Sequence, residues 1–260
     1  MLKRRNALLF LAGSLGAAAL AVSLDLRAAD AASPASAVSP ASLRGKTIVI
    51  DPGHNGLNYR HSSEINRLVG AGTLRKACDT TGAETASGYT EAAFNFDVAL
   101  RVAAILRRSG ARVVLTRRSN AGWGPCITQR AAIGNRARAA AAVSIHADGG
   151  PSSGRGFHVI YPPSLRGLTD DIAAASRRLA LTMRRAYLAT GVPYATYLGG
   201  QGLSVRSDLG GLNLSDVPKV FIETGNMRNA TDARLQTSAG FRQRAAQAIA
   251  SGLATFVSRS

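Results

Sequence analysis

Short apolar runs alternate with amphipathic segments along most of this 260-residue chain, and this alternation constrains the fold more than any other feature. Runs of strand length and composition lie at 47–50, 111–116, 142–146, 157–161 and 217–224. Segments with helical spacing lie at 90–109, 127–141, 170–190 and 239–257. The alternation predicts a single α/β domain of three layers, with a largely parallel twisted sheet flanked by helices.

Two stretches lack a sustained period. Residues 57–89 are rich in Gly, Thr and Ser, and we expect a long functional or flexible loop there. Residues 192–213 are rich in Gly and are also expected to be irregular. The run at 157–161 is followed by Pro162 and Pro163, which favours a strand at the edge of the sheet.

The N-terminus has the layout of a secretory signal peptide. The basic residues Lys3–Arg5 precede the apolar stretch Ala7–Leu24, and Ala-x-Ala sites predict cleavage after Ala31 or Ala37. The alternative is an uncleaved membrane anchor, because an apolar run of this length borders on the length of a membrane span. We expect residues 1–31 to be removed, with no stable membrane insertion afterwards.

An Ala/Ser/Pro linker is expected at 32–42, and the folded domain at 43–260. The domain is therefore expected in the periplasm or in the cell wall and extracellular space. Nothing in the sequence points to an obligate dimer, so a monomer is expected.

The charge of the chain is strongly positive. The formal net charge is +17, and residues 1–31 carry four basic and two acidic side chains, so the remainder keeps +15. Such a charge favours a polyanionic neighbour. Nucleic acid is not expected as the partner, because the chain has export signals and no basic cluster interleaved with aromatic residues. An anionic cell envelope fits an exported basic protein better.

The chain has two cysteines, Cys78 and Cys126. In an exported protein this even number favours one disulfide, which would tether the 57–89 loop to the body of the domain. The alternative is a pair of buried free thiols. Two cysteines this far apart do not make a cysteine-type zinc site.

Side chains that can bind a metal ion or transfer a proton lie where the predicted strands end. The first strand runs into Asp51–His54, the third into Ser144–Asp148 and the last into Ile222–Asn226, while Glu91 opens the helix after the long loop. Because parallel strands end at one edge of the sheet, the fold would bring His54, His146 and Glu223 together there.

Two histidines and one carboxylate are a usual ligand set for catalytic zinc, and a further glutamate can transfer protons. Ordinary explanations also exist. A histidine at a strand end is more often hydrogen-bonded than metal-bound, and Glu91 suits a helix N-terminus without any metal. Glu223 could pair with Arg228, while Asp51 and Asp148 could shape turns or orient the histidines.

Four segments together are similar in order and spacing to a known family. They are DPGHNG, TEAAFNFDVALRVAAIL, QRAAIGNRARAAAAVSIHAD and VFIETGNMRN. From about Gly45 to Ser258 the chain resembles the zinc-dependent N-acetylmuramoyl-L-alanine amidases of the amidase-3 type, in particular the small mycobacterial-type members that consist of the catalytic domain alone. The family cleaves peptidoglycan at the amide between N-acetylmuramic acid and L-alanine.

The resemblance implies residue roles. It makes His54, Glu91 and His146 the ligands of one zinc ion, and Glu223 the general base and then acid. Arg130 and Asn135 match family positions with a structural or substrate-positioning role, and we expect Asp148 and Asn226 to support the site. The long loop that carries Cys78 and the absence of a wall-binding repeat depart from the family, and they affect substrate range and recruitment.

Two other functions are compatible with parts of this evidence. A non-catalytic wall-binding protein could share the fold, although such proteins typically lose a ligand or the catalytic glutamate. A zinc peptidase or deacetylase on another fold is the second alternative. The sequence contains no HExxH motif, which argues against the commonest peptidase type.

Overall fold

The computed structural model describes residues 43–259. The predicted signal peptide (1–31) and linker (32–42) lie outside these residues. The described part is built on a six-stranded sheet in the order β4-β1-β5-β8-β6-β7. Its strands are β1 (Thr47–Pro52), β4 (Arg112–Leu115), β5 (Ala141–Asp148), β6 (His158–Tyr161), β7 (Leu203–Val205) and β8 (Lys219–Asn226).

The sheet is mostly parallel, as the alternation predicted. β1 pairs in parallel with β4 and β5, β5 with β8 and β6 with β7, whereas β6 runs antiparallel to β8. The prediction of an edge strand at 157–161 was wrong, because β7 pairs with the outer side of β6. β7 has only three residues and lies in the Gly-rich segment that the sequence marked as irregular, too short for a periodic signal.

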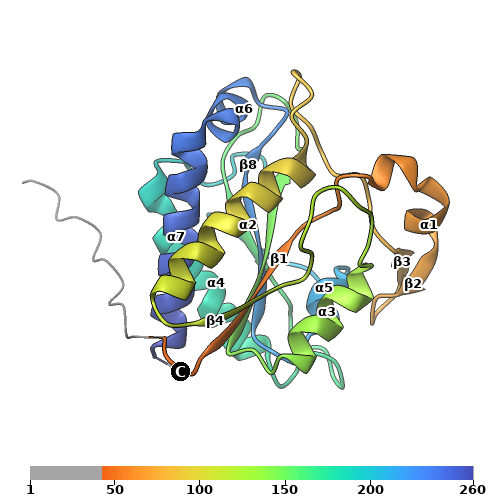
Figure 1. Cartoon of the computed structure of the whole chain (residues 1–260), viewed down its shortest axis with the longest axis vertical. Helices are drawn as coiled ribbons and strands as arrows, with labels where there is room; N and C mark the ends of the chain where they lie inside the picture. The colour runs from red at the N-terminus through yellow and green to blue at the C-terminus, as the bar shows by residue number, and fades with distance from the viewer. Residues whose placement is uncertain (1–42, 260) are drawn as a thin grey trace, which may run out of the picture. The chain divides into compact units, whose positions relative to one another are not determined.

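Helices cover both faces of the sheet. They are α1 (Ser62–Asn66), α2 (Glu91–Arg108), α3 (Ile127–Arg136), α4 (Ala173–Tyr187), α5 (Gly210–Asn213), α6 (Ala230–Thr237) and α7 (Ala239–Val257), with 3-10 turns η1 (Asn58–Arg60) and η2 (Leu188–Thr190). Figure 1 shows α2, α4 and α7 on one side of the sheet, and α3 and α5 on the other. The three-layer α/β prediction is therefore confirmed.

The side chains of β1 show how the strand divides the core. Ile48 and Ile50 belong to the large apolar cluster that includes α2, α4 and α7, while Val49 faces the opposite way with Ala142 and Val217. This period of two is that of a strand buried on both faces. Asp51, which follows in the same alternation, therefore faces the side of α3.

The helix predicted at 90–109 is confirmed. The Thr90 hydroxyl caps α2 by accepting a hydrogen bond from the Ala93 amide, and Phe94, Val98 and Val102 are fully buried along one face. The closing helix α7 has the predicted bounds.

The helix predicted at 127–141 is shorter than expected. α3 ends at Arg136, and Ala141 already belongs to β5. Alanine-rich sequence favours a helix locally, but the left-handed backbone of Arg138 (φ 46°) ends the helix before the strand.

Segment 57–89 is more ordered than predicted. Besides η1 and α1, it contains a two-stranded antiparallel sheet of β2 (Leu68–Gly70) and β3 (Arg75–Ala77). The predicted disulfide is present between Cys78 and Cys126, with 4.7 Å between their Cα atoms, and it joins this segment to the start of α3. Within residues 43–259, none of the helices has both the length and the hydrophobicity of a membrane span.

Candidate metal centre and active-site cleft

Three side chains of the predicted ligand set meet at the carboxyl end of the sheet. His54 lies just past β1, His146 lies near the end of β5, and Glu91 is the first residue of α2. One donor atom from each lies within 4.8 Å of the others, so all three can contact a single ion. They come together only because β1 and β5 are parallel neighbours and α2 begins beside their ends.

The donor atoms face one another. The Nε2 atom of His54 lies 3.2 Å from Glu91 Oε2, and the Nδ1 atom of His146 lies 2.9 Å from Glu91 Oε1. On the other side of its ring, His54 Nδ1 lies 2.9 Å from the carbonyl oxygen of Thr80. A carbonyl only accepts hydrogen bonds, so Nδ1 carries a proton, and Nε2 is the ring atom directed toward Glu91.

Glu91 is buried and held by backbone donors. Its Oε2 atom accepts a hydrogen bond of 2.8 Å from the Ala83 amide, and Oε1 accepts one of 3.1 Å from the Ala147 amide. These bonds fix both carboxylate oxygens toward the histidines. The position at a helix N-terminus also favours the negative charge, so the ordinary explanation and the ligand role are compatible.

The electrostatic environment of these three side chains favours a positive charge between them. Burial raises the pKa of Glu91, but His54 and His146 outweigh burial and hold this pKa well below its ordinary value. Burial lowers the pKa of His54, yet the carboxylates of Glu91 and Asp79 raise it well above its ordinary value. A buried anion that stabilises a cation between three donors is the electrostatic environment of a metal site.

The backbone around His54 is strained and crowded. His54 itself has a left-handed conformation with φ 58°, which is uncommon for a non-glycine residue. A Cβ atom at Gly53 would lie 2.2 Å from His146 Cε1, and one at Gly82 would lie 2.8 Å from His54 Cδ2. Only glycine therefore lets the chain pass this close to both imidazole rings.

Arg130 holds the turn that carries His54. Its guanidinium donates to the carbonyl oxygens of Pro52 (2.7 Å) and His54 (2.8 Å) and to the Asp51 carboxylate (2.8 Å). Arg130 is buried in α3, beneath the strand end. Of the two roles considered for this residue, its contacts support the structural one.

Arg117 was not singled out from the sequence. It is buried and donates to the carbonyl oxygens of Pro52, Gly53 and Ala92, which joins the β1 turn to the first turn of α2. Its position directly after the second predicted strand, at the same edge of the sheet, is the signal that could have identified it.

Asp51 is buried, and its carboxylate contacts the neighbouring strands. It accepts hydrogen bonds from Thr116 and Ser144, and its Oδ2 atom lies 3.1 Å from the buried ammonium group of Lys219. Burial raises the pKa of Asp51, but Lys219 and Arg130 hold it well below the usual range. Through these contacts Asp51 connects β1 to β5 and β8 beneath the candidate metal site.

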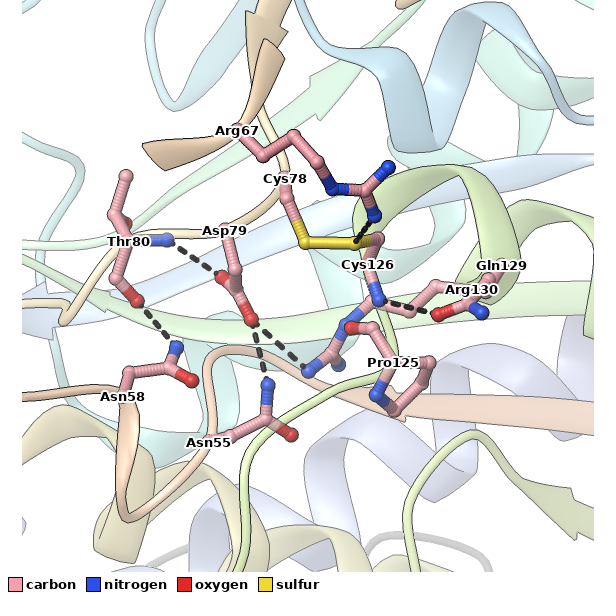
Figure 2. The surroundings of a disulfide bond; sticks show 10 residues. All are labelled: Asn55, Asn58, Arg67, Cys78, Asp79, Thr80, Pro125, Cys126, Gln129 and Arg130. Carbon is pink, nitrogen blue, oxygen red and sulfur yellow. Dashed lines mark hydrogen bonds and ion pairs between the residues drawn. A yellow bond between two sulfur atoms is a disulfide. The ribbon is translucent and has the colours of Figure 1, made fainter. Parts of the chain in front are cut away.

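The disulfide supports the other side of His54. Figure 2 shows Asp79, directly after Cys78, between Asn55 and Arg130, with hydrogen bonds or ion pairs to both. Asp79 Oδ1 also lies 3.6 Å from His54 Nδ1, and the next residue supplies the carbonyl oxygen that this imidazole contacts. The 57–89 segment therefore orients a candidate ligand.

Glu223 lies in the same cleft as the three ligands. In the sheet it is the register partner of His146, and it lines the cleft with His54, Glu91 and His146. Among the described residues its Oε2 atom has no hydrogen-bond partner, although it is shielded from solvent. Burial first, and then the carboxylates of Glu91 and Asp148, raise the pKa of Glu223 well above its ordinary value.

The sequence also predicted supporting roles for Asp148 and Asn226. Asp148 lines it and accepts a hydrogen bond of 2.9 Å from the Tyr197 hydroxyl, a partner that sequence reasoning missed. Asn226 is fully buried and donates to the carbonyls of Pro151 and Gly154, so it holds the loop after β5.

Asn135 lies elsewhere in the fold. It donates to the carbonyl of Leu214 and accepts from the Asp216 amide, and it does not line the cleft. Of the two roles considered for it, these contacts support the structural one, because they join α3 to the segment before β8.

Known proteins are similar to this chain over most of its length. The family model described as Amidase_3, N-acetylmuramoyl-L-alanine amidase, matches residues 48–255. An N-acetylmuramoyl-L-alanine amidase of Mycobacterium tuberculosis is 43% identical over 221 residues, which are 84% of this chain and 89% of that protein.

Solved structures are similar as well. The crystal structure of the N-acetylmuramyl-L-alanine amidase Ami1 from Mycobacterium smegmatis matches with a TM-score of 0.79 and 42% identity, over 84% of this chain and 99% of that one. Apo Ami1 from Mycobacterium abscessus matches with a TM-score of 0.77 and 42% identity, over 82% and 99%. The chain therefore belongs to the N-acetylmuramoyl-L-alanine amidase family of the amidase-3 type.

Proposed function

We propose that this peptidoglycan amidase is a zinc-dependent hydrolase that cuts the amide between N-acetylmuramic acid and the L-alanine of the stem peptide. Family membership supports the reaction. The observation that carries the mechanism is the convergence of His54, Glu91 and His146 beside the unpartnered carboxylate of Glu223.

The donor set suits one zinc ion. Two neutral imidazoles and one carboxylate leave a bound Zn²⁺ with net positive charge and an open position. His54 Nε2, His146 Nδ1 and a Glu91 oxygen would hold it, since these are the atoms that already face one another. A zinc ion bound here would supply a Lewis acid that polarises the scissile carbonyl and makes water more acidic.

Glu223 would carry the proton transfers. As a general base it takes a proton from the water that adds to the carbonyl carbon, and as a general acid it returns a proton to the L-alanine nitrogen when the C–N bond breaks. Burial and the neighbouring carboxylates raise the pKa of Glu223, which makes its carboxylate a stronger base for this role. Its Oε2 atom has no described partner to compete for that proton.

The non-catalytic wall-binding alternative is less favoured, because all four residues are present and lie in one cleft. The zinc content of the purified protein and the release of stem peptide from muropeptides distinguish the two. We expect Glu223→Ala to keep its zinc and to lose activity by about 10²- to 10⁴-fold. His146→Ala should lose zinc as well, and Glu64→Gln, which changes a partly exposed carboxylate outside the cleft, should retain both.

Two outcomes would contradict the scheme. Full activity in Glu223→Ala would remove this residue from proton transfer. Full zinc binding in His146→Ala would remove that residue from the metal centre.

We also propose that residues 1–31 direct export and are removed, that 32–42 form a linker, and that the mature domain works as a monomer in the periplasm or cell wall. The sequence pattern of the N-terminus supports the first two proposals. The N-terminal residue of the exported protein tests them: an intact Met1 would contradict cleavage. The mass of the purified domain in solution tests the monomer.

A further inference from the structure

Arg228 lies where the cleft that contains the candidate zinc ligands and Glu223, here called the metal cleft, meets a second groove. It follows β8 by two residues and lines the cleft with His146, Asp148 and Glu223. It also lines a neighbouring groove bounded by the segment 81–86 that precedes α2, together with Asn55, Gly56, Tyr59, Thr90 and Ala92. A substrate that extends from the metal cleft into this groove must pass Arg228.

The Arg228 side chain lies beside Gly149. Its amide donates to Asn226 Oδ1 (3.0 Å), which fixes the backbone after β8. A Cβ atom built on Gly149 would lie 3.5 Å from Arg228 Nε and 3.0 Å from Ala83 Cβ. The guanidinium therefore lies across Gly149, close to the residue whose amide holds Glu91.

Of the two arginines that line the metal cleft, Arg228 is the one without a charged partner among the described residues. The other arginine of the metal cleft, Arg206, donates two hydrogen bonds to Asp208, of 2.8 and 2.7 Å, and is neutralised. The side chain of Arg228 makes no hydrogen bond or ion pair within residues 43–259, and it is exposed. Its location, and not the lack of a partner alone, suggests a ligand, because this chain has many surface arginines.

The substrate of the proposed function carries a carboxylate close to the bond to be cut. The bond to be cut precedes L-alanine, and the next residue of the stem is a D-glutamate linked onward through its side chain. Its α-carboxylate is therefore free unless the cell converts it to an amide. A planar guanidinium binds such a carboxylate through two parallel hydrogen bonds, which a neutral amide cannot reproduce.

We propose that Arg228 binds the α-carboxylate of the second stem residue and makes the enzyme selective for stems in which this group is not amidated. The groove along 81–86 would take the peptide beyond it. This inference rests on the proposed amidase function, since it assumes that the L-alanine nitrogen lies at the metal cluster.

Two N-acetylmuramoyl-tripeptides that differ only in this group, α-carboxylate or α-carboxamide, test the proposal. We expect the wild type to show a kcat/KM about ten-fold or more higher on the carboxylate, the size expected for a hydrogen bond to a charged group. Arg228→Gln should lose this ratio, because its kcat/KM on the carboxylate falls more than its kcat/KM on the amide, and Arg228→Lys should keep part of the ratio. The matched control is Arg234→Gln, which removes the same charge from the neighbouring helix α6 outside the cleft and should keep the full ratio.

A wild type without preference, or an Arg228→Gln variant that keeps the preference, would overturn the role of Arg228 and leave the amidase function standing. A preference lost equally in Arg234→Gln would show a general charge effect and would also overturn it. If the wild type with bound zinc releases no stem peptide from either substrate, the proposed function fails, and this inference fails with it.

Discussion

At the scale of single residues, the candidate metal site of His54, Glu91 and His146 depends on a glycine that has no side chain. Gly53 separates the end of β1 from His54, and the imidazole of His146 occupies the space that a Cβ would need. The candidate site residues were visible in the sequence because two histidines and Glu223 lie at the ends of apolar runs, while Glu91 opens the helix after the long loop. The packing of Gly53 against His146 was not visible, since it joins residues that are far apart in the chain.

We predict that Gly53→Ala weakens zinc binding by about 10- to 100-fold, because the added Cβ must displace His146 from its position beside Glu91. Gly122→Ala is the matched control, since an added Cβ there meets no atom within 4 Å. Competition with a chelating dye measures both affinities. Equal affinities in the two variants would show that the imidazole can shift at no cost to the site.

At the scale of elements, the disulfide connects a surface segment to the chemistry. Cys78 precedes the two residues that contact the ring of His54, and Cys126 precedes α3, which contains Arg130. The sequence predicted the pairing from the cysteine count. It did not show that both cysteines lie next to supports of the same imidazole, because that depends on how segment 57–89 folds back onto β1.

We predict that the double variant Cys78→Ser/Cys126→Ser is less stable by about 4 kcal/mol, the entropic estimate for a closed loop of 48 residues. Urea unfolding of the zinc-free proteins measures this. At urea concentrations where the variant is still folded, its zinc affinity should also be lower, because Asp79 and Thr80 are then less firmly held against His54. An unchanged zinc affinity would show that the disulfide affects the stability of the fold and not the metal site.

At the scale of the whole molecule, the net charge of +17, of which +15 remains without residues 1–31, favours retention on an anionic wall. We predict that binding to purified cell walls falls when NaCl is raised from about 0.05 M to about 0.5 M, since salt screens exposed charges. Co-sedimentation measures the bound fraction, and walls stripped of their anionic polymers are the control. Binding that does not change with salt would rule out the electrostatic explanation.

The sequence by itself determined the layered α/β class and the bounds of α7, because these follow from local periodicity. With the family resemblance it also named the four residues of the cleft. Only the tertiary structure decided that β6 is an inner strand, that Asp51 is neutralised by Lys219 and Arg130, and that Arg228 faces the cleft. These features are contacts between distant segments, and their energies depend on burial and charge pairing that no local pattern encodes.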